Sequence, residues 1–155
     1  MYVLDHSQEQ IVARIRDIVQ TSIAPNAIET DANATFPKAS IQALADSGFF
    51  GLTLPKDVGG MGQPPRVFVA IVEEIALACA STAMIYVMHI AATQGILHSK
   101  TLGHREPLLR DIASGKHLTT LAFSESGSRS QFWAPVSRLT ANANGDGFTT
   151  NAIKS

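Results

Sequence analysis

The sequence is poor in the residue types that several classes of protein need. It has one cysteine, Cys79, which excludes an internal disulfide framework and a cysteine-rich zinc site. Charged residues make up only 16% of the chain, and the 12 Lys and Arg do not outnumber the 13 Asp and Glu. With a net charge of −1 there is no basic excess to neutralise phosphates, so we expect no nucleic-acid partner.

The sequence also lacks the signals that direct a chain out of the cytoplasm. Residues 1–6 contain neither the basic region nor the apolar run of a signal peptide, which predicts a cytoplasmic location. Hydrophobic residues make up 45% of the 155 residues, so the chain is suited to bury a core of about one domain. Composition therefore excludes intrinsic disorder but assigns no function.

A run without Asp, Glu, Lys or Arg extends over residues 75–97 and is long enough to span a bilayer. Four polar residues interrupt it: Thr82, His89, Thr93 and Gln94. The triplet 80–82 is typical of a helix junction, with Ser81 as the N-cap of the following helix. We interpret the run as two buried helices and expect no membrane partner.

Apolar residues recur at three- and four-residue spacing in five segments, which predicts five helices. These are residues 8–21, 37–48, 66–79, 82–99 and 105–113. Pro25 is predicted to end the first helix, and residues 26–35 are predicted to form a loop. Gly48 is predicted to be the C-terminal glycine of the second helix.

The pattern changes after Lys116. Residues 117–123, 136–143 and 148–153 read as strands, and the Asn144–Gly147 turn predicts a hairpin between the last two. The fold class is therefore mainly α, with an up-and-down bundle of about five helices followed by a few β-strands. Because the sequence ends inside the last predicted strand, we interpret it as part of a longer protein.

Several candidate chemical sites have simpler structural explanations. His89 and His98 lie nine residues apart on opposite faces of one helix, so we expect no metal site. Glu73 and Glu74 point about 100° apart on a helix and cannot act as a catalytic pair. We expect one of them to face solvent and the other to cap a helix or pair with an arginine. The glycine loop 59–62 lacks the lysine and hydroxyl of a phosphate-binding loop.

The segment 121–133 is the strongest candidate for a binding site. A predicted strand runs into a loop dense in hydroxyl side chains and backbone N–H groups, beside the apolar Phe132 and Trp133. Such a loop can offer donors and acceptors to a polar heteroaromatic ring or a phosphate. The residues alone also allow a surface loop whose serines form turns.

At this loop the sequence resembles the acyl-CoA dehydrogenase superfamily, and the order of further motifs extends the resemblance over nearly the whole chain. The matching motifs are Phe36-Pro37, Gly51-Leu52, Pro55 to Gly62, Glu73-Glu74, Gly103, Leu108-Leu109, Ser114-Gly115, Ser124 to Gln131, and Asp146-Gly147-Phe148 through Asn151 to Lys154. Each motif is moderately specific, whereas their order and spacing together are strong.

The resemblance implies a helical N-terminal domain at residues 1–116 and, at 117–155, the start of a middle β domain that is an incomplete β-barrel. It implies FAD as cofactor, with FMN as the alternative, bound by Leu121, Phe123, Ser124, Gly127 and Ser130. Ser130, Tyr86 and His89 would contact the substrate. No catalytic residue is nominated, because the C-terminal domain that carries the family's usual glutamate base is absent.

The implied activity of the intact protein is FAD-dependent α,β-dehydrogenation of an acyl-CoA thioester in fatty acid metabolism, by a homo-oligomer. The chain by itself is expected to be inactive. Three loop positions depart from the family's pattern: Ser126, Arg129 and Gln131. They leave open a different small-molecule substrate, or the branch that hydroxylates small aromatics with reduced flavin and oxygen. A non-enzymatic helical module for binding or assembly is a further alternative.

Overall fold

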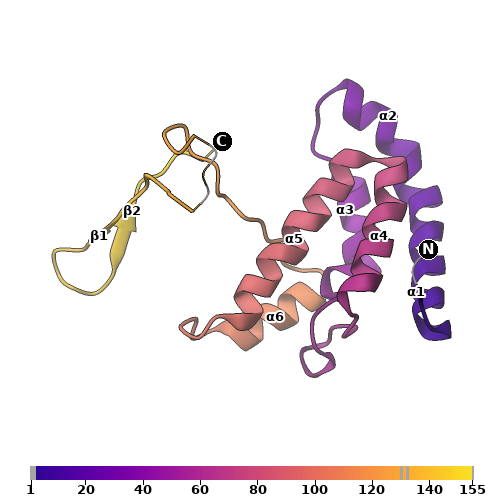
Figure 1. Cartoon of the computed structure of the whole chain (residues 1–155), viewed down its shortest axis with the longest axis horizontal. Helices are drawn as coiled ribbons and strands as arrows, with labels where there is room; N and C mark the ends of the chain where they lie inside the picture. The colour runs from indigo at the N-terminus through magenta and orange to yellow at the C-terminus, as the bar shows by residue number, and fades with distance from the viewer. Residues whose placement is uncertain (1–2, 130, 132, 155) are drawn as a thin grey trace. The chain divides into compact units, whose positions relative to one another are not determined.

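The computed structural model describes residues 3–129, 131 and 133–154, and it is mainly helical, as predicted (Figure 1). The chain forms two compact units, residues 1–120 and residues 121–155. The first is a helical unit, and the second contains a β-hairpin.

The helical unit contains six α-helices in its described residues. They are α1 (His6–Ile18), α2 (Ala24–Ala32), α3 (Lys38–Asp46), α4 (Pro65–Ala78), α5 (Ala80–His98) and α6 (Arg105–Ala113). Three short elements link them: a π-helical turn η1 (Val19–Ile23) and the 3₁₀ turns η2 (Phe49–Gly51) and η3 (Lys56–Val58). In the bundle, α4 packs against both α1 and α5, and α5 also contacts α6 (Figure 1).

The helix α2 corrects the prediction of a loop at residues 26–35. Pro25 does not end the helical region, because it occupies the first turn of α2. In that turn a proline lacks only an N–H that a helix leaves unpaired in any case, and its fixed φ suits the helix. The chain reaches α2 from α1 through the π turn η1, so the helical path is almost continuous from His6 to Ala32.

The predicted junction inside the apolar run lies two residues earlier than expected. Cys79 adopts an extended conformation (φ −152°, ψ 103°), separates α4 from α5, and is the N-cap of α5 in place of Ser81. Its Sγ accepts from the Thr82 N–H at 3.5 Å and from Thr82 Oγ1 at 3.2 Å. The helix α5 is long and apolar enough to cross a membrane, yet it packs on α4 and buries four polar side chains in the unit. Packing on α4 and burial of polar side chains inside the unit are features of a core helix.

Two hydrophobic clusters hold the helical unit together. The larger lies among α1, α3, α4 and α5 and includes the fully buried Ile15, Leu44 and Ile71. The smaller joins the 51–63 loop to α6 through Leu54, Val58, Leu109, Ile112 and Ala113. The loop is therefore part of the packed unit and not a mobile excursion from it.

Backbone hydrogen bonds close the 51–63 loop on itself. The N–H groups of Met61, Gly62 and Gln63 donate to the carbonyls of Gly51, Leu54 and Leu52 at 2.8–2.9 Å. A side chain on Gly60 would lie 2.2 Å from the Leu54 carbonyl oxygen, so the two arms can approach this closely only because position 60 is glycine.

The second unit confirms the predicted hairpin and corrects the predicted strand before it. Strands β1 (Leu139–Ala141) and β2 (Phe148–Thr150) pair antiparallel, with Thr140 opposite Thr149. The Asn142 N–H closes the turn on the Gly147 carbonyl at 2.9 Å. Residues 117–123, by contrast, form no strand, because the described residues offer them no partner strand and a strand exists only in a ladder.

Candidate functional site

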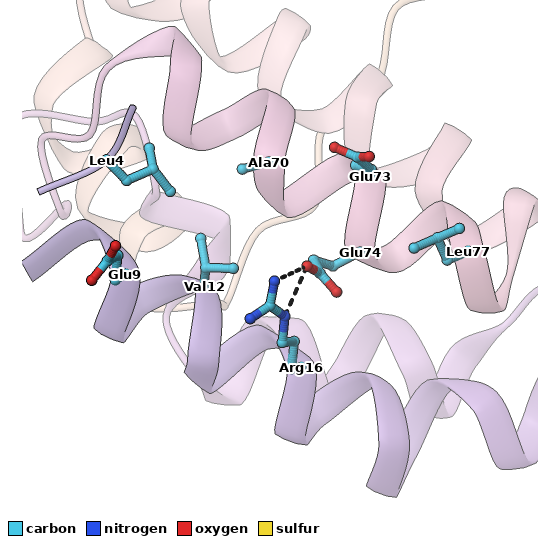
Figure 2. A pocket seen from close by; sticks show the side chains of 8 residues that line it. All are labelled: Leu4, Glu9, Val12, Arg16, Ala70, Glu73, Glu74 and Leu77. Atoms are coloured by element: carbon cyan, nitrogen blue, oxygen red, sulfur yellow. Dashed lines mark hydrogen bonds and ion pairs between the residues drawn. The ribbon is translucent and has the colours of Figure 1, made fainter. Parts of the chain in front are cut away.

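A groove of about 740 Å³ is lined by residues of α1 and α4 in the helical unit (Figure 2). Its lining mixes apolar and charged side chains: Leu4, Glu9, Val12, Arg16, Ala70, Glu73, Glu74 and Leu77. Figure 2 shows Arg16 of α1 reaching across to Glu74 of α4, where its Nη2 and Nε lie 2.6 and 2.8 Å from Oε1. Because this ion pair is partly exposed, it contributes at most about 1 kcal/mol.

The adjacent glutamates behave as predicted. Glu74 pairs with an arginine, and Glu73 is exposed. Within the described ranges, no three His, Cys, Asp or Glu side chains gather closely enough to hold a metal ion.

A second hollow in the same unit, of about 290 Å³, is predominantly apolar. We call it the apolar pocket, and it is lined by Phe36, Met84, Ile85, Met88, Leu118, Thr119 and Thr120. One side comes from α5 and another from residues 117–120, which we call the exit segment because the chain leaves the helical unit there. Sequence reasoning selected neighbouring residues of α5 and missed these methionines.

Tyr86 and His89, the two α5 residues predicted to bind substrate, lie in the core of the helical unit. Both are fully buried. The Tyr86 hydroxyl donates to the Phe49 carbonyl at 2.8 Å, and burial raises its pKa. His89 Nε2 lies 3.2 Å from the Phe50 carbonyl oxygen, and the His89 and Phe50 rings are in tilted contact, with centroids 4.3 Å apart and planes at 40°. Neither side chain is among the residues that line the apolar pocket, and direct contact with a substrate stays a prediction.

The residues predicted to bind cofactor lie on one segment of the second unit. Leu121 is half-buried, whereas Phe123, Ser124 and Gly127 are exposed. Ser130 lies outside the described residues. A methyl group on Gly127 would lie 3.3 Å from the Val136 side chain, so the loop runs close to the chain that follows it.

The buried carboxylate of Glu125 organises this loop, a role that sequence reasoning missed. One of its oxygens, Oε2, accepts from the Val136 N–H at 2.5 Å and from the Ser137 N–H at 2.9 Å. The other accepts from Ser137 Oγ at 2.5 Å and from Lys154 Nζ. The hydrogen bonds from Lys154 and Ser137 lower the pKa of Glu125 to about 2. One side chain thus ties together three stretches that are far apart in the sequence.

Acid is expected to loosen the second unit through Glu125. Because its pKa is lower in the folded chain than its ordinary value of 4.5, the stabilisation is complete above pH 4.5 and is lost as the pH falls towards about 2. An acid titration followed by NMR should show the Val136 and Ser137 amide protons moving upfield over this window. Glu125→Gln should abolish that transition, whereas Glu106→Gln, at an exposed carboxylate of α6, should leave it intact. A transition that persists in Glu125→Gln would contradict this role.

Comparison with known proteins places this architecture in a family. Residues 5–116 match the family model described as acyl-CoA dehydrogenase, N-terminal domain. The match spans the helices and the closed 51–63 loop described above. The chain belongs to the acyl-CoA dehydrogenase family.

Similar sequences agree with this assignment. The chain is 31% identical to a 3-sulfinopropanoyl-CoA desulfinase of Variovorax paradoxus over 99% of its own length and 38% of that protein. It is 33% identical to a 3-(aryl)acrylate reductase of Clostridium sporogenes over 95% of its length and 39% of that protein. The chain thus spans well under half the length of these relatives.

Solved structures show the same fold. Butyryl-CoA dehydrogenase from Megasphaera elsdenii matches with a TM-score of 0.88 at 22% identity, over 99% of this chain and 41% of that one. A glutaryl-coenzyme A dehydrogenase in complex with glutaryl-CoA matches with a TM-score of 0.86 at 22% identity, over 99% of this chain and 40% of that one.

Proposed function

We propose that this chain supplies the N-terminal part of a flavin-dependent enzyme that removes two hydrogens across the α,β carbons of an acyl-CoA thioester. The observation that carries the proposal is the family match over residues 5–116, together with relatives and structural neighbours named for CoA thioesters. As part of the same proposal, the intact protein is a homo-oligomer. Ile28 and Leu77, which are 84% and 81% exposed in the helical unit, are apolar surface that association would cover.

The donor set of segment 121–127 fits the polar edge of a flavin. The backbone of the segment is not paired with another strand. The Ser124 side chain is exposed, and Gly127 adds no side chain beside Ser124. We assign Leu121, Phe123, Ser124 and Gly127 to the cofactor, with the Ser124 hydroxyl as hydrogen-bonding group, and Ser130 by resemblance alone. FAD, when bound, supplies the hydride acceptor. The part of Glu125 is to hold the loop in shape through Val136, Ser137 and Lys154.

The apolar pocket suits the acyl part of the substrate. Its methionine and isoleucine side chains offer no hydrogen bonds to a hydrocarbon chain and keep water away from it. Tyr86 and His89 lie on the same helix and anchor it to η2. In this proposal the chain binds and orients the substrate, and it contributes no proton-transfer group.

Flavin binding is the direct test. The purified chain is mixed with FAD, desalted, and examined by visible absorption; we expect it to retain flavin absorbance. Ser124→Ala should weaken binding about fivefold, which corresponds to one hydrogen bond of about 1 kcal/mol. Ser126→Ala, at another exposed serine of the loop, should bind as the unchanged chain does.

Two outcomes would contradict the proposal. A colourless chain would show that residues 121–130 do not form a flavin site in this polypeptide. Equal weakening by both serine variants would remove the assignment of Ser124. Separately, the chain is expected to reduce no dye when given FAD and an acyl-CoA, and dye reduction would overturn the expectation that it is inactive by itself.

A further inference from the structure

The exit segment is held to α5 by a buried histidine. The backbone N–H of Thr119 donates to His89 Nδ1 at 3.1 Å. Because Nδ1 accepts this hydrogen bond, the ring proton resides on Nε2, which donates to the Phe50 carbonyl at 3.2 Å. The imidazole therefore joins three elements, α5, η2 and the exit segment, and the hydrogen bond from the Thr119 N–H forms only when the ring is neutral.

The Thr119 side chain reinforces this attachment. Its hydroxyl lies 3.0 Å from the His89 carbonyl oxygen, 3.0 Å from His89 Nδ1 and 3.2 Å from Thr93 Oγ1. Thr119 is 9% exposed, whereas the neighbouring Leu118 is 40% exposed. Thr119 is therefore the buried residue of the exit segment, and the hydrogen bonds around His89 hold it in place.

The exit segment is also a wall of the apolar pocket. Leu118, Thr119 and Thr120 line this pocket together with Met84 and Met88 of α5. Thr119 is therefore both a lining residue of the pocket and the residue that His89 holds. Any change in the Thr119–His89 hydrogen bond therefore acts on the shape of the pocket.

We propose that His89 is a positioning residue whose neutral imidazole closes the wall of the apolar pocket by holding Thr119, and that protonation of His89 releases this wall. The relevance of this wall to an acyl substrate rests on the proposed function; the attachment and its release do not. His89 thus acts on a bound ligand through Thr119.

The surroundings of His89 favour the neutral ring. Burial lowers its pKa to about 4, and the nearby His117 acts in the same direction, while the hydrogen bond to the Phe50 carbonyl opposes it. In the described part of the chain, His117 is the titratable group that acts on the His89 ring. The other partners of the ring, Phe50 on η2 and Thr119 on the exit segment, are uncharged. Release of the exit segment frees Nδ1 to take up a proton, so the pKa of His89 is higher in the open form and opening becomes easier as the pH falls towards about 4.

Two amide substitutions separate the two hydrogen bonds of the ring. In His89→Asn the side-chain oxygen can stand where Nδ1 stands and accept from Thr119, but nothing reaches Phe50. In His89→Gln the side-chain N–H₂ can stand where Nε2 stands and donate to Phe50, but the acceptor for Thr119 is lost. Both remove the ring, and Gln is one methylene larger than Asn, so a role limited to filling space predicts slower exchange in His89→Gln, the opposite of the result expected here.

Hydrogen exchange of the Thr119 amide measures the attachment directly. In the full chain at neutral pH, we expect exchange at least about tenfold faster in His89→Gln than in His89→Asn, with the unchanged chain at least as slow as His89→Asn. His98→Gln, at an exposed histidine of the same helix, should leave the rate unchanged. Equal rates in the two His89 variants would overturn the proposal.

The methionines report on the pocket without any substitution. When the ε-methyl groups are labelled with ¹³C, acid should shift the signals of Met84 and Met88 with the titration of His89, while Met61, outside the pocket, stays constant. Titration of His89 with no change at Met84 and Met88 would contradict the proposal even if both variants failed to fold. Neither measurement uses flavin or an acyl-CoA, so failure here is distinct from failure of the proposed function.

Discussion

Alanine in place of Gly60 is expected to destabilise the helical unit by about 3 kcal/mol, the upper end of the usual cost of forcing a methyl group into a packed interior. The added Cβ would lie 2.2 Å from the Leu54 carbonyl oxygen and 2.5 Å from its carbonyl carbon. Both are backbone atoms, so no side-chain rotation relieves the clash. The loop 51–63 would have to open, and with it the cluster that Leu54 forms with α6.

Thermal unfolding followed by circular dichroism measures this effect, and a fall in Tm of roughly 10 °C is expected for a unit of this size. Gly95→Ala is the matched control. An alanine at this position of α5 would contact nothing within 4 Å, and the helix should gain about 0.5 kcal/mol. Equal Tm values for the Gly60 and Gly95 variants would show that the two arms of the loop are not packed as described.

Leu44→Ala is expected to cost about 3 kcal/mol through the cavity it leaves in the larger cluster. Leu44 lies on α3, is fully buried and belongs to the cluster that includes Ile15 and Ile71. Urea unfolding should show a lower midpoint with little change of slope, because the same surface is exposed on unfolding.

Leu77→Ala provides the same substitution at a residue of α4 that is 81% exposed. Because little apolar surface is lost there, its free energy of unfolding should change by less than about 0.5 kcal/mol. If the two leucine variants were equally unstable, the assignment of the core would be wrong. A change in self-association confined to Leu77→Ala would instead support its place in an interface between subunits.

Local signals allowed most of the helices to be predicted. Gly48 follows α3 in the left-handed conformation typical of the C-terminal glycine that the sequence pattern indicated. The turn after β1 was equally clear, because Asn144 to Gly147 is an unambiguous hairpin sequence. These features depend on a few neighbouring residues, so the chain carries their signal locally.

Pro25 shows where such signals mislead. A proline between two helical patterns reads as a stop, yet in the first turn of a helix it is compatible with continuation. Which of the two occurs depends on whether η1 and α2 can pack; Ile23 and Thr30 are buried, so they do. The predicted strand at residues 117–123 failed for a related reason, because strand formation requires a partner that local sequence does not reveal.

The candidate site also has one part that could be predicted from the sequence and one part that could not. The hydroxyl-rich loop after Leu121 was visible in the sequence through its composition and its resemblance to a family. The carboxylate of Glu125 gave no such signal, because its partners Val136, Ser137 and Lys154 lie 11 to 29 residues away. His89 was singled out, but its partners Phe50 and Thr119 lie 39 and 30 residues away.

The helical character of the chain, the hairpin that follows and the family that its motifs match could be predicted from the sequence, because each of these rests on spacing and composition within short segments. The buried polar groups that hold the site became apparent only when the chain was seen folded. A buried carboxylate or imidazole is stable only with its hydrogen-bond partners in place. Those partners are brought together when α5 packs on η2 and the exit segment, and when the loop of Glu125 meets Lys154.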